Sequence, residues 1–252
     1  MQPLFCDRME AGQMLAAYLN PYANQSNVLV LALPRGGVAV AFEVAQLLRA
    51  PMDVLLVRKL GVPHYKEFAM GAIASGGIRV LNQNIVRALH IPNEAIETVT
   101  AEEERELRRR EKTYRGHRAS LKIRDKTIIL VDDGISTGST VQAALEALKE
   151  RQPRRVVMAT PVASSSSCAQ CRSLVDEMVV LATPAECHDI GNAYQDFAPV
   201  FDSEVIRLME SARATHVPVD IGIGTLALRP AVTWSTSFFP EMRGNVGNRG
   251  RA

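Results

Sequence analysis

The sequence has little of what marks secreted, membrane-bound or nucleic-acid-binding proteins. Its four cysteines in 252 residues are too few for a disulfide scaffold, and no apolar run approaches the ~20 residues that a transmembrane helix needs. The N-terminal residues are too polar for a signal peptide. Twenty-nine Lys and Arg face 27 Asp and Glu, a balance that lacks the basic excess that attracts nucleic acid or anionic lipid. These absences predict a soluble, cytoplasmic protein that binds neither nucleic acid nor membranes.

Short apolar runs alternate with helical patterns over most of the chain. The expected strands span residues 28–33, 52–57, 127–131, 156–160 and 178–181. Runs that are apolar throughout suit strands buried on both faces of a parallel sheet. Their alternation with helices predicts an α/β fold, a Rossmann-like, doubly wound parallel sheet with right-handed crossovers. In such sheets ligands bind beyond the carboxyl ends of the strands.

Other segments lie outside this alternation. Residues 71–81 (GAIASGGIRVL) predict a hairpin that turns at Ser75-Gly76-Gly77. Residues 94–114 predict a polar helix with Glu and Arg four positions apart on a solvated face. Residues 1–212 are expected to form one domain. Residues 213–252 are expected to form a partly disordered tail, because its end is rich in Gly, Asn and Arg.

The strongest chemical signal is the segment 127–140, TIILVDDGISTGST. A buried strand delivers Asp132 and Asp133 to its tip, ahead of a loop and a helix start that are rich in Gly, Ser and Thr. Backbone amides and hydroxyls there can cradle a phosphate, and the glycines let the backbone approach it. Two carboxylates would repel that phosphate unless they face hydroxyls or a hard cation such as Mg²⁺. The implied ligand therefore carries a phosphate beside a diol, as ribose 5-phosphate does.

Simpler or competing interpretations of these motifs fit less well. A capped helix after a strand would use Asp and Ser for turn chemistry alone, but a cap needs one such residue and this loop has six. The chain has no G-x-x-x-x-G-K-[ST] motif and the segment has no G-x-G-x-x-G. A zinc site built from Cys168, Cys171, Cys187 and His188 lacks the usual ligand spacing, and the stretch SSSSCAQC is typical of a helix with a serine cap.

The segment VDDGISTGST resembles the phosphoribosyl-pyrophosphate signature of type I phosphoribosyltransferases. The resemblance covers roughly residues 5–210 and implies a parallel α/β core with a small hood, built from the N-terminal segment and about residues 182–200. It assigns Asp132 and Asp133 to the ribose hydroxyls and to magnesium, as catalytic groups. It assigns the following loop to the substrate's 5-phosphate, through Gly134, Ser136, Thr137, Gly138, Ser139 and Thr140. Gly134 is smaller than the aliphatic residue that many family members have there.

Pro34-Arg35-Gly36-Gly37 resembles the family's pyrophosphate loop, which follows the first core strand. There, Arg35, Gly36 and Gly37 would bind substrate, and the resemblance implies a cis bond between Pro34 and Arg35. Arg58 and Lys59 end the next predicted strand, where basic residues of the family approach the pyrophosphate or cross a dimer interface. Arg58 would bind substrate and Lys59 would be catalytic. A common turn and a solvated strand end would explain the same residues without a ligand.

Two further segments take their roles from the resemblance alone. Residues 62–70 (VPHYKEFAM) occupy the position of the family's mobile loop, with His64 and Lys66 as candidates and Glu67 as a catalytic residue. Residues 190–197 (IGNAYQDF) resemble the segment that receives the acceptor. The rings of Tyr194 or Phe197 could stack on a base, and Asp196 could meet an exocyclic amine or a metal-bound water. Loop polarity and core packing would account for the same side chains.

The resemblance implies an enzyme that transfers 5-phosphoribosyl from phosphoribosyl pyrophosphate to an acceptor nitrogen, taken to be that of a nucleobase, and releases pyrophosphate. Magnesium is the implied cofactor, and the phosphoribosyl donor and a small-molecule acceptor are the implied partners of a homodimer. Two other functions stay open. The protein could be a non-catalytic regulator that binds the same donor, although no basic helix-turn-helix segment is visible, or it could hydrolyse the donor without a specific acceptor.

Overall fold

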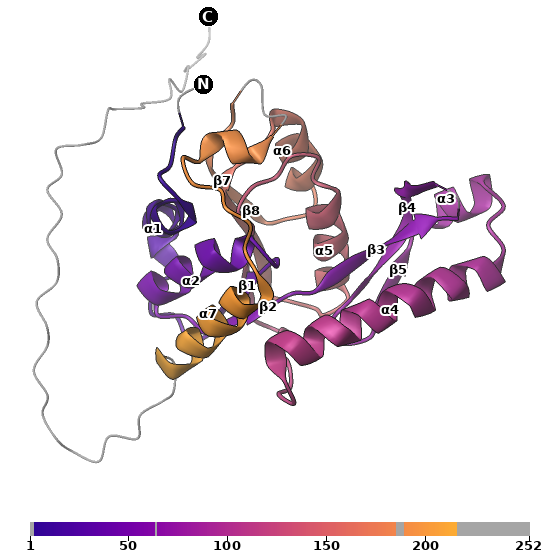
Figure 1. Ribbon diagram of the computed structural model, residues 1–252, viewed down its shortest axis with the longest axis horizontal. Helices are drawn as coiled ribbons and strands as arrows, with labels where there is room; N and C mark the ends of the chain where they lie inside the picture. Colours follow the sequence, from indigo (N-terminus) through magenta and orange to yellow (C-terminus); the bar gives the residue numbers. More distant parts are fainter. Residues whose placement is uncertain (1–2, 64, 185–188, 216–252) are drawn as a thin grey trace, which may run out of the picture. The chain divides into compact units, whose positions relative to one another are not determined.

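The computed structural model of the chain describes residues 3–63, 65–184 and 189–215 (Figure 1). Its main sheet has five parallel strands in the order β2-β1-β6-β7-β8. These strands are β1 (Val28–Ala32), β2 (Met52–Val54), β6 (Thr127–Val131), β7 (Arg155–Val162) and β8 (Glu177–Ala182). Each of the five predicted strand segments contributes to this sheet, so the predicted parallel α/β fold is confirmed. The predicted tail lies outside the described residues from residue 216 onward.

Helices cover both faces of the main sheet (Figure 1). One face packs against α1 (Arg8–Tyr18), α2 (Gly37–Leu48) and α7 (Asp202–Thr215). The other packs against α5 (Ser139–Lys149) and α6 (Ser165–Arg172). The serine cap expected from the sequence is present at α6, where Ser164 accepts a hydrogen bond from the amide of Ser167. Asp7 caps α1 in the same way by accepting from the amide of Glu10.

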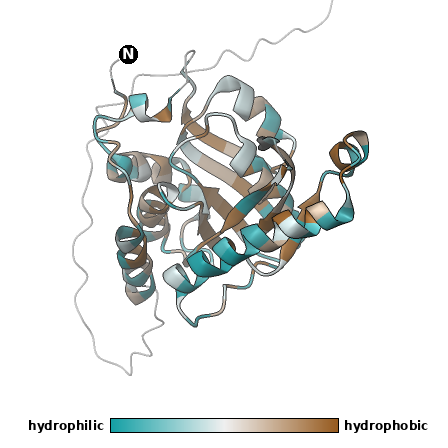
Figure 2. Cartoon of the chain, turned by 45° about the vertical axis from the view of Figure 1, so that its right-hand side comes forward, coloured by the Kyte–Doolittle hydropathy of each residue, from teal (hydrophilic) through white to brown (hydrophobic). Residues whose placement is uncertain are grey.

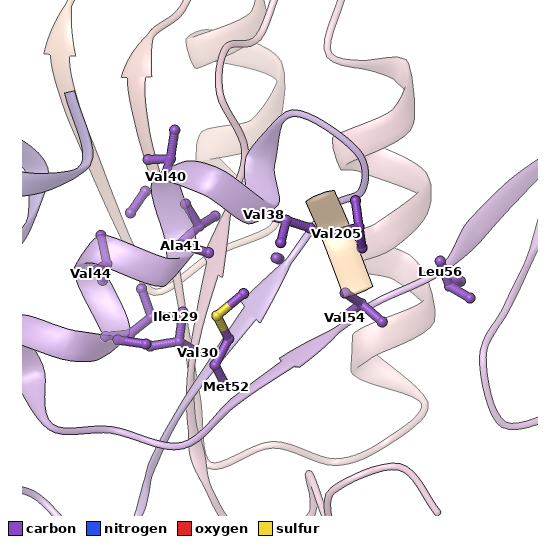
Figure 3. Packing of buried hydrophobic residues seen from close by; sticks show 14 of the residues in the cluster. Val30, Val38, Val40, Ala41, Val44, Met52, Val54, Leu56, Ile129 and Val205 are labelled. Carbon is purple, nitrogen blue, oxygen red and sulfur yellow. The ribbon is translucent and has the colours of Figure 1, made fainter. Parts of the chain in front are cut away.

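The central strands are buried on both faces, as their unbroken apolar runs predict. In β1, Val28 and Val30 face the α1–α2–α7 side, while Leu29 and Leu31 face the α5–α6 side. The strand β6 alternates in the same way. Figure 3 shows the first of these layers, where Val30 lies among strand and α2 side chains. Burying each such aliphatic side chain contributes about 1.5–3 kcal/mol, so this double-sided packing fixes the strand ends that carry the functional loops.

A second, antiparallel sheet joins β3 (Val57–Val62), β4 (Tyr65–Ala74) and β5 (Ile78–Leu81). Two helices follow it, α3 (Gln83–Ala88) and the long α4 (Asn93–Arg115). The predicted hairpin over residues 71–81 is present and turns through Gly76 and Gly77, whose φ angles are +87° and +77°. The predicted polar helix is α4, and Figure 2 shows it largely teal beside the brown strands. Its ion pairs include Arg108 with Glu104.

The strand predicted over residues 52–57 is two strands of different sheets. β2 ends at Val54. Asp53 in this strand is buried and forms an ion pair of 3.0 Å with Arg115 of α4. Arg115 also donates to the Val54 carbonyl. The chain then leaves the parallel sheet, and the Leu56 amide donates to the Ser75 hydroxyl of the hairpin at 3.2 Å. The apolar run could not show this change, because it depends on a partner 62 residues away.

Most of the segment predicted to be the mobile loop, residues 62–70, lies in a strand. Residues 65–70 belong to β4, which pairs with β3 on one side and β5 on the other. The run FAMGAIA is apolar enough to lie in a sheet, and Gly71 gives the close approach to β5 that a Cβ would block at the Val80 carbonyl. Glu67 therefore lies on a strand. His64, and the side chains of Lys66 and Glu67, are outside the described part of the chain.

The N-terminal segment packs against the residues that follow β8. Phe5 forms an isolated parallel bridge with Tyr194, and both are buried with Ala193 and Val162 in a small apolar cluster. A short 3₁₀ helix over Ile190–Ala193 carries this contact. The hood and the domain boundary at residue 212 stay predictions. Within the described ranges, no helix is both long and apolar enough to cross a membrane.

Candidate functional site

Two loops that the sequence singles out meet at the carboxyl ends of adjacent strands. β1 and β6 are paired up to Ala32 and Val131, so the segments that follow them start side by side. A Cβ at Gly36 would lie 1.8 Å from Oδ2 of Asp133, and one at Gly37 would lie 2.9 Å from Cα of Asp132. Only glycine permits this approach. The Pro34–Arg35 peptide bond is cis, as the resemblance predicted.

The two adjacent carboxylates of the site differ in their surroundings. Burial, and then the charge of neighbouring Asp133, raise the pKa of Asp132 above its usual value. Asp133 instead lies against a cation, with Oδ2 accepting a hydrogen bond of 2.7 Å from Nε of Arg8. The Asp133 amide also donates to Oδ1 of Asp132 at 3.0 Å. Positively charged or hydroxyl-bearing ligands would relieve the unfavourable burial of negative charge at Asp132.

Arg8 is the site residue that sequence reasoning missed. It lies on α1, which comes from the N-terminal segment, and no strand end marks it. Its guanidinium reaches Asp133 and donates through Nη1 to the Ala198 carbonyl at 2.9 Å, and it lies 3.8 Å from the ring centroid of Phe197. The one sequence signal was a cation in the first turn of a helix, where the helix dipole disfavours it.

The predicted phosphate loop leads into the N-terminus of α5. Gly138 precedes this helix with φ +74°, a left-handed conformation that glycine adopts readily. The start of α6 fixes this loop, because the hydroxyls of Ser164 and Ser167 both donate to the Ser136 carbonyl. The hydroxyls of Thr137 and Ser139 lie 3.3 Å apart, and Thr140 is exposed in the first turn. This end of α5 can therefore present backbone amides and hydroxyls to an anion.

The basic pair after β2 lies on β3 and points to two different helices. The Lys59 ammonium is 3.5 Å from the Ser139 hydroxyl, so it faces the start of α5. The Arg58 guanidinium forms an ion pair of 2.6 Å with Glu103 of α4. Successive side chains of a strand alternate in direction, which explains the split. Lys59 therefore lies at the predicted phosphate loop, at the start of α5. Arg58 links the second sheet to α4.

Arg35 extends from the glycine loop toward α7. Its guanidinium is about half exposed and lies 3.9 Å from Asp202, which also accepts a hydrogen bond of 2.7 Å from the Tyr114 hydroxyl. Burial and the Asp202 carboxylate raise the pKa of Tyr114 to about 12. The long, exposed contact leaves Arg35 free to turn toward an anion.

Gly134 lies where the loop after β6 meets the segment after β8. A Cβ at Gly134 would lie 2.1 Å from Cγ2 of Ile190. Ile190 belongs to the segment after β8, so its side chain fills the space that a larger residue at position 134 would need.

The aromatic residues predicted to receive a base are packed together. Tyr194 is 4% exposed, stacks on Phe197 at 4.9 Å between ring centroids and lies 5.4 Å from Phe5. Its hydroxyl donates to the Asp133 carbonyl at 2.5 Å. This packing ties the segment to the loop after β6, and the stacking role of Tyr194 stays a prediction. Asp196 is exposed, and its carboxylate accepts from the Ala198 amide at 2.9 Å.

The described residues offer a pair of carboxylates as metal ligands, and no larger cluster. Among the residues that the structure describes, no group of three or more His, Cys, Asp or Glu side chains is placed to hold an ion. Cys168 and Cys171 lie on α6, and Cys187 and His188 fall outside the described ranges. A pair of carboxylates, Asp132 and Asp133, still fits Mg²⁺, which commonly takes one or two carboxylates together with substrate oxygens.

An acidic pair, a glycine loop and a hydroxyl-rich helix start meet at one edge of the parallel sheet, which is the arrangement that the resemblance to phosphoribosyltransferases implied. The chain is a member of the phosphoribosyl transferase family, because the model of the phosphoribosyl transferase domain matches residues 8–183.

Known relatives agree with this assignment. Two Mycobacterium tuberculosis proteins, from strains H37Rv and CDC 1551, each named "Putative phosphoribosyl transferase", are 42% identical over 209 residues. The match covers 83% of this chain and 47% of theirs, so the chain spans about half the length of these curated relatives. The crystal structure of TT1426 from Thermus thermophilus is 38% identical, with a TM-score of 0.76, and the match covers 84% of this chain and 99% of that one.

Proposed function

We propose that the protein transfers a 5-phosphoribosyl group from phosphoribosyl pyrophosphate to an acceptor nitrogen and releases pyrophosphate. The observation that carries this proposal is the direct contact of the glycine loop with the acidic pair, where Gly36 and Gly37 lie against Asp133 and Asp132. Family membership supports it. The donor has a phosphate at one end, a diol in the middle and a pyrophosphate at the other end. The start of α5, the acidic pair and the glycine loop are the parts of the site that suit these groups, in that order.

Each part of the donor has a place. The 5-phosphate would lie at the N-terminus of α5, on the amides and hydroxyls of residues 136–140. The ribose hydroxyls would donate to Asp132 and Asp133. The pyrophosphate would lie over residues 35–37, and Lys59 would reach it by turning from Ser139, which its ammonium faces in the structure. Holding both ends of the donor supplies catalysis by positioning alone, because it fixes carbon 1 against the acceptor.

The chemistry is dissociation of the bond between carbon 1 and the pyrophosphate oxygen, while the acceptor nitrogen forms a new bond to carbon 1 and releases its proton to solvent. Electrons of the broken bond leave with the pyrophosphate, and carbon 1 gains positive charge. The carboxylates of Asp132 and Asp133 favour that charge, while Lys59 and Arg35 stabilise the departing anion. When bound, Mg²⁺ would neutralise part of the pyrophosphate charge.

The acceptor is proposed to be a nucleobase or another small molecule with a nucleophilic nitrogen, on the side of residues 190–198. Asp196 is exposed there and could accept from an amino group. We also propose a homodimer, for which the exposed Tyr65 and Phe68 of β4 offer an apolar surface. Light scattering at micromolar concentration tests the dimer.

A donor-binding regulator is the alternative function, because fold and donor loop alone do not require turnover. The test is pyrophosphate release from phosphoribosyl pyrophosphate and Mg²⁺ over a panel of nucleobases, with the double variant Asp132→Asn/Asp133→Asn beside the wild type. We expect turnover by the wild type and a loss of at least 10²–10³-fold in the variant. The matched control is Asp125→Asn, on an exposed residue with φ +62° that Asn adopts readily.

The outcomes separate the alternatives. Tight donor binding with no turnover over the whole panel would favour the regulator. Pyrophosphate release without any acceptor would favour hydrolysis. A wild-type protein that does not bind the donor would refute the assignment of residues 132–140.

A further inference from the structure

We propose that Arg8 is a positioning residue, which orients Asp133 for the donor and links donor binding to the segment of residues 194–198. The inference rests on the proposed function and deepens it. It concerns a side chain from the N-terminal helix that no motif marks.

Arg8 makes several different contacts at once. Its Nε donates to Oδ2 of Asp133 at 2.7 Å, its Nη1 donates to the Ala198 carbonyl at 2.9 Å, and its guanidinium lies 3.8 Å from the Phe197 ring centroid. A guanidinium can do this because its donors form a planar fork while its face remains available to an aromatic ring. A lysine ammonium lacks both the fork and the face.

The position of Arg8 is locally unfavourable. It is the first residue of α1, where the helix dipole disfavours a cation, and its side chain is only 11% exposed. A charge so placed needs a compensating partner, and in the described part of the chain its ion-pair partner is Asp133, 125 residues away. Arg8 stands where the local structure disfavours it, and its long-range partner is a carboxylate proposed to bind the substrate. Such a local conflict indicates a functional role.

The ion pair leaves Asp133 able to bind a ligand. Arg8 occupies Oδ2, and a carboxylate has further lone pairs on both oxygens, so Oδ1 can accept from a ribose hydroxyl. The pairing also makes the acidic pair asymmetric, because no ion pair of Asp132 occurs among the described residues. Asp133 is thereby held as an oriented carboxylate.

The same guanidinium reaches the acceptor side. Ala198 and Phe197 follow Tyr194, whose hydroxyl donates to the Asp133 carbonyl. Asp133 is therefore tied to this segment twice, through its backbone by Tyr194 and through its side chain by Arg8. A donor that fixes the Asp133 carboxylate should fix Arg8 and, with it, residues 194–198. Donor binding would in this way order the surface that receives the acceptor.

The experiment measures two properties of the full-length chain with phosphoribosyl pyrophosphate and Mg²⁺. Calorimetry gives the donor Kd, and hydrogen exchange gives the protection of amides 194–198 with and without donor. The variants are Arg8→Gln, Arg8→Lys, Asp133→Asn and the double Arg8→Gln/Asp133→Asn. Arg79→Gln is the matched control, because Arg79 also pairs with a carboxylate at 2.8 Å, Glu97, but in an exposed position.

In the wild type we expect donor to increase protection of residues 194–198. Arg8→Gln should bind donor about tenfold more weakly and lose that added protection, while Arg8→Lys should restore part of the affinity but little of the protection. The double variant should bind no more weakly than the weaker single variant, because both changes break one interaction. Melting temperatures identify unfolding, which Arg8→Lys is expected to avoid.

Wild-type affinity and wild-type protection in Arg8→Gln would overturn the proposal for Arg8 while leaving the donor site intact. Additive losses in the double variant would also overturn it, because they would show that Arg8 acts apart from Asp133. A wild-type protein that fails to bind the donor would refute the proposed function, and the role of Arg8 would fall with it.

Discussion

Replacing Gly36 by alanine should displace the Asp133 carboxylate, which we propose to be catalytic, with little change elsewhere. Gly36 has φ −57° and ψ −40°, a conformation that alanine adopts without strain, so the change adds only one methyl group. That methyl would lie 1.8 Å from Oδ2 and 2.5 Å from Cγ of Asp133. Reaching an ordinary contact of about 3.4 Å requires the oxygen to move by about 1.6 Å.

Such a movement cannot keep the Arg8–Asp133 hydrogen bond, which is 2.7 Å long. The carboxylate would leave both its cation and its position opposite the donor. A misplacement of about 1 Å costs on the order of 10²-fold in rate, so we expect turnover to fall at least that far. Overpacking of this kind costs about 1–3 kcal/mol, and the lower end applies because the displaced group is the end of a side chain.

The assay compares pyrophosphate release and melting temperature in Gly36→Ala and Gly12→Ala. A Cβ at Gly12 would lie 2.8 Å from Cβ of Glu43 and from the Val40 carbonyl, so this control also crowds a helix contact but not Asp133. We expect Gly12→Ala to lose stability and keep its rate per folded molecule. Wild-type turnover in Gly36→Ala would show that the position of Asp133 does not matter for the reaction.

Three further predictions concern neighbouring groups. Asp132→Asn should raise the melting temperature of the ligand-free protein, because the raised pKa means that ionisation of this carboxyl opposes folding. The gain in melting temperature should be small near pH 3.8, the ordinary pKa of the group, and grow as the pH rises. Equal gains at pH 4 and pH 8 would contradict this. Tyr194→Phe should lower stability by about 1 kcal/mol through loss of the hydrogen bond to the Asp133 carbonyl, and urea unfolding with no change would show that the bond contributes nothing. Lys59→Gln should reduce turnover about 10²-fold without changing the melting temperature, because its contact with Ser139 is long at 3.5 Å; unchanged turnover would remove Lys59 from the reaction.

Much of the main sheet could be predicted from sequence because its signals are local. Each central strand is a continuous apolar run, and the motifs follow the ends of β1 and β6, which pair in register from Val28 with Thr127 to Ala32 with Val131. The encounter of Gly36 with Asp133 then follows from strand adjacency.

What the sequence did not reveal depends on contacts between distant residues. Arg8 meets Asp133 across 125 positions, and β2 stops where Asp53 meets Arg115 across 62. The strand β4 was assigned to a mobile loop by its place in the family, against the apolar run that follows Phe68. The burial of Tyr194 could not be predicted either, because an aromatic residue's spacing does not tell whether its ring is buried.

The close approach of Gly134 and Ile190 has a consequence for how sequences of this family can diverge. The volume between the loop after β6 and the segment after β8 has room for one large side chain, and in this chain Ile190 occupies it. A lineage that gains a branched side chain at position 134 should therefore hold a smaller residue at position 190, and the two changes should be inherited together. Either change alone would leave this volume overfilled or partly empty, and each of these states would be destabilised by an amount that selection can detect. These two positions should behave as a single inherited unit, although 56 positions separate them in the chain.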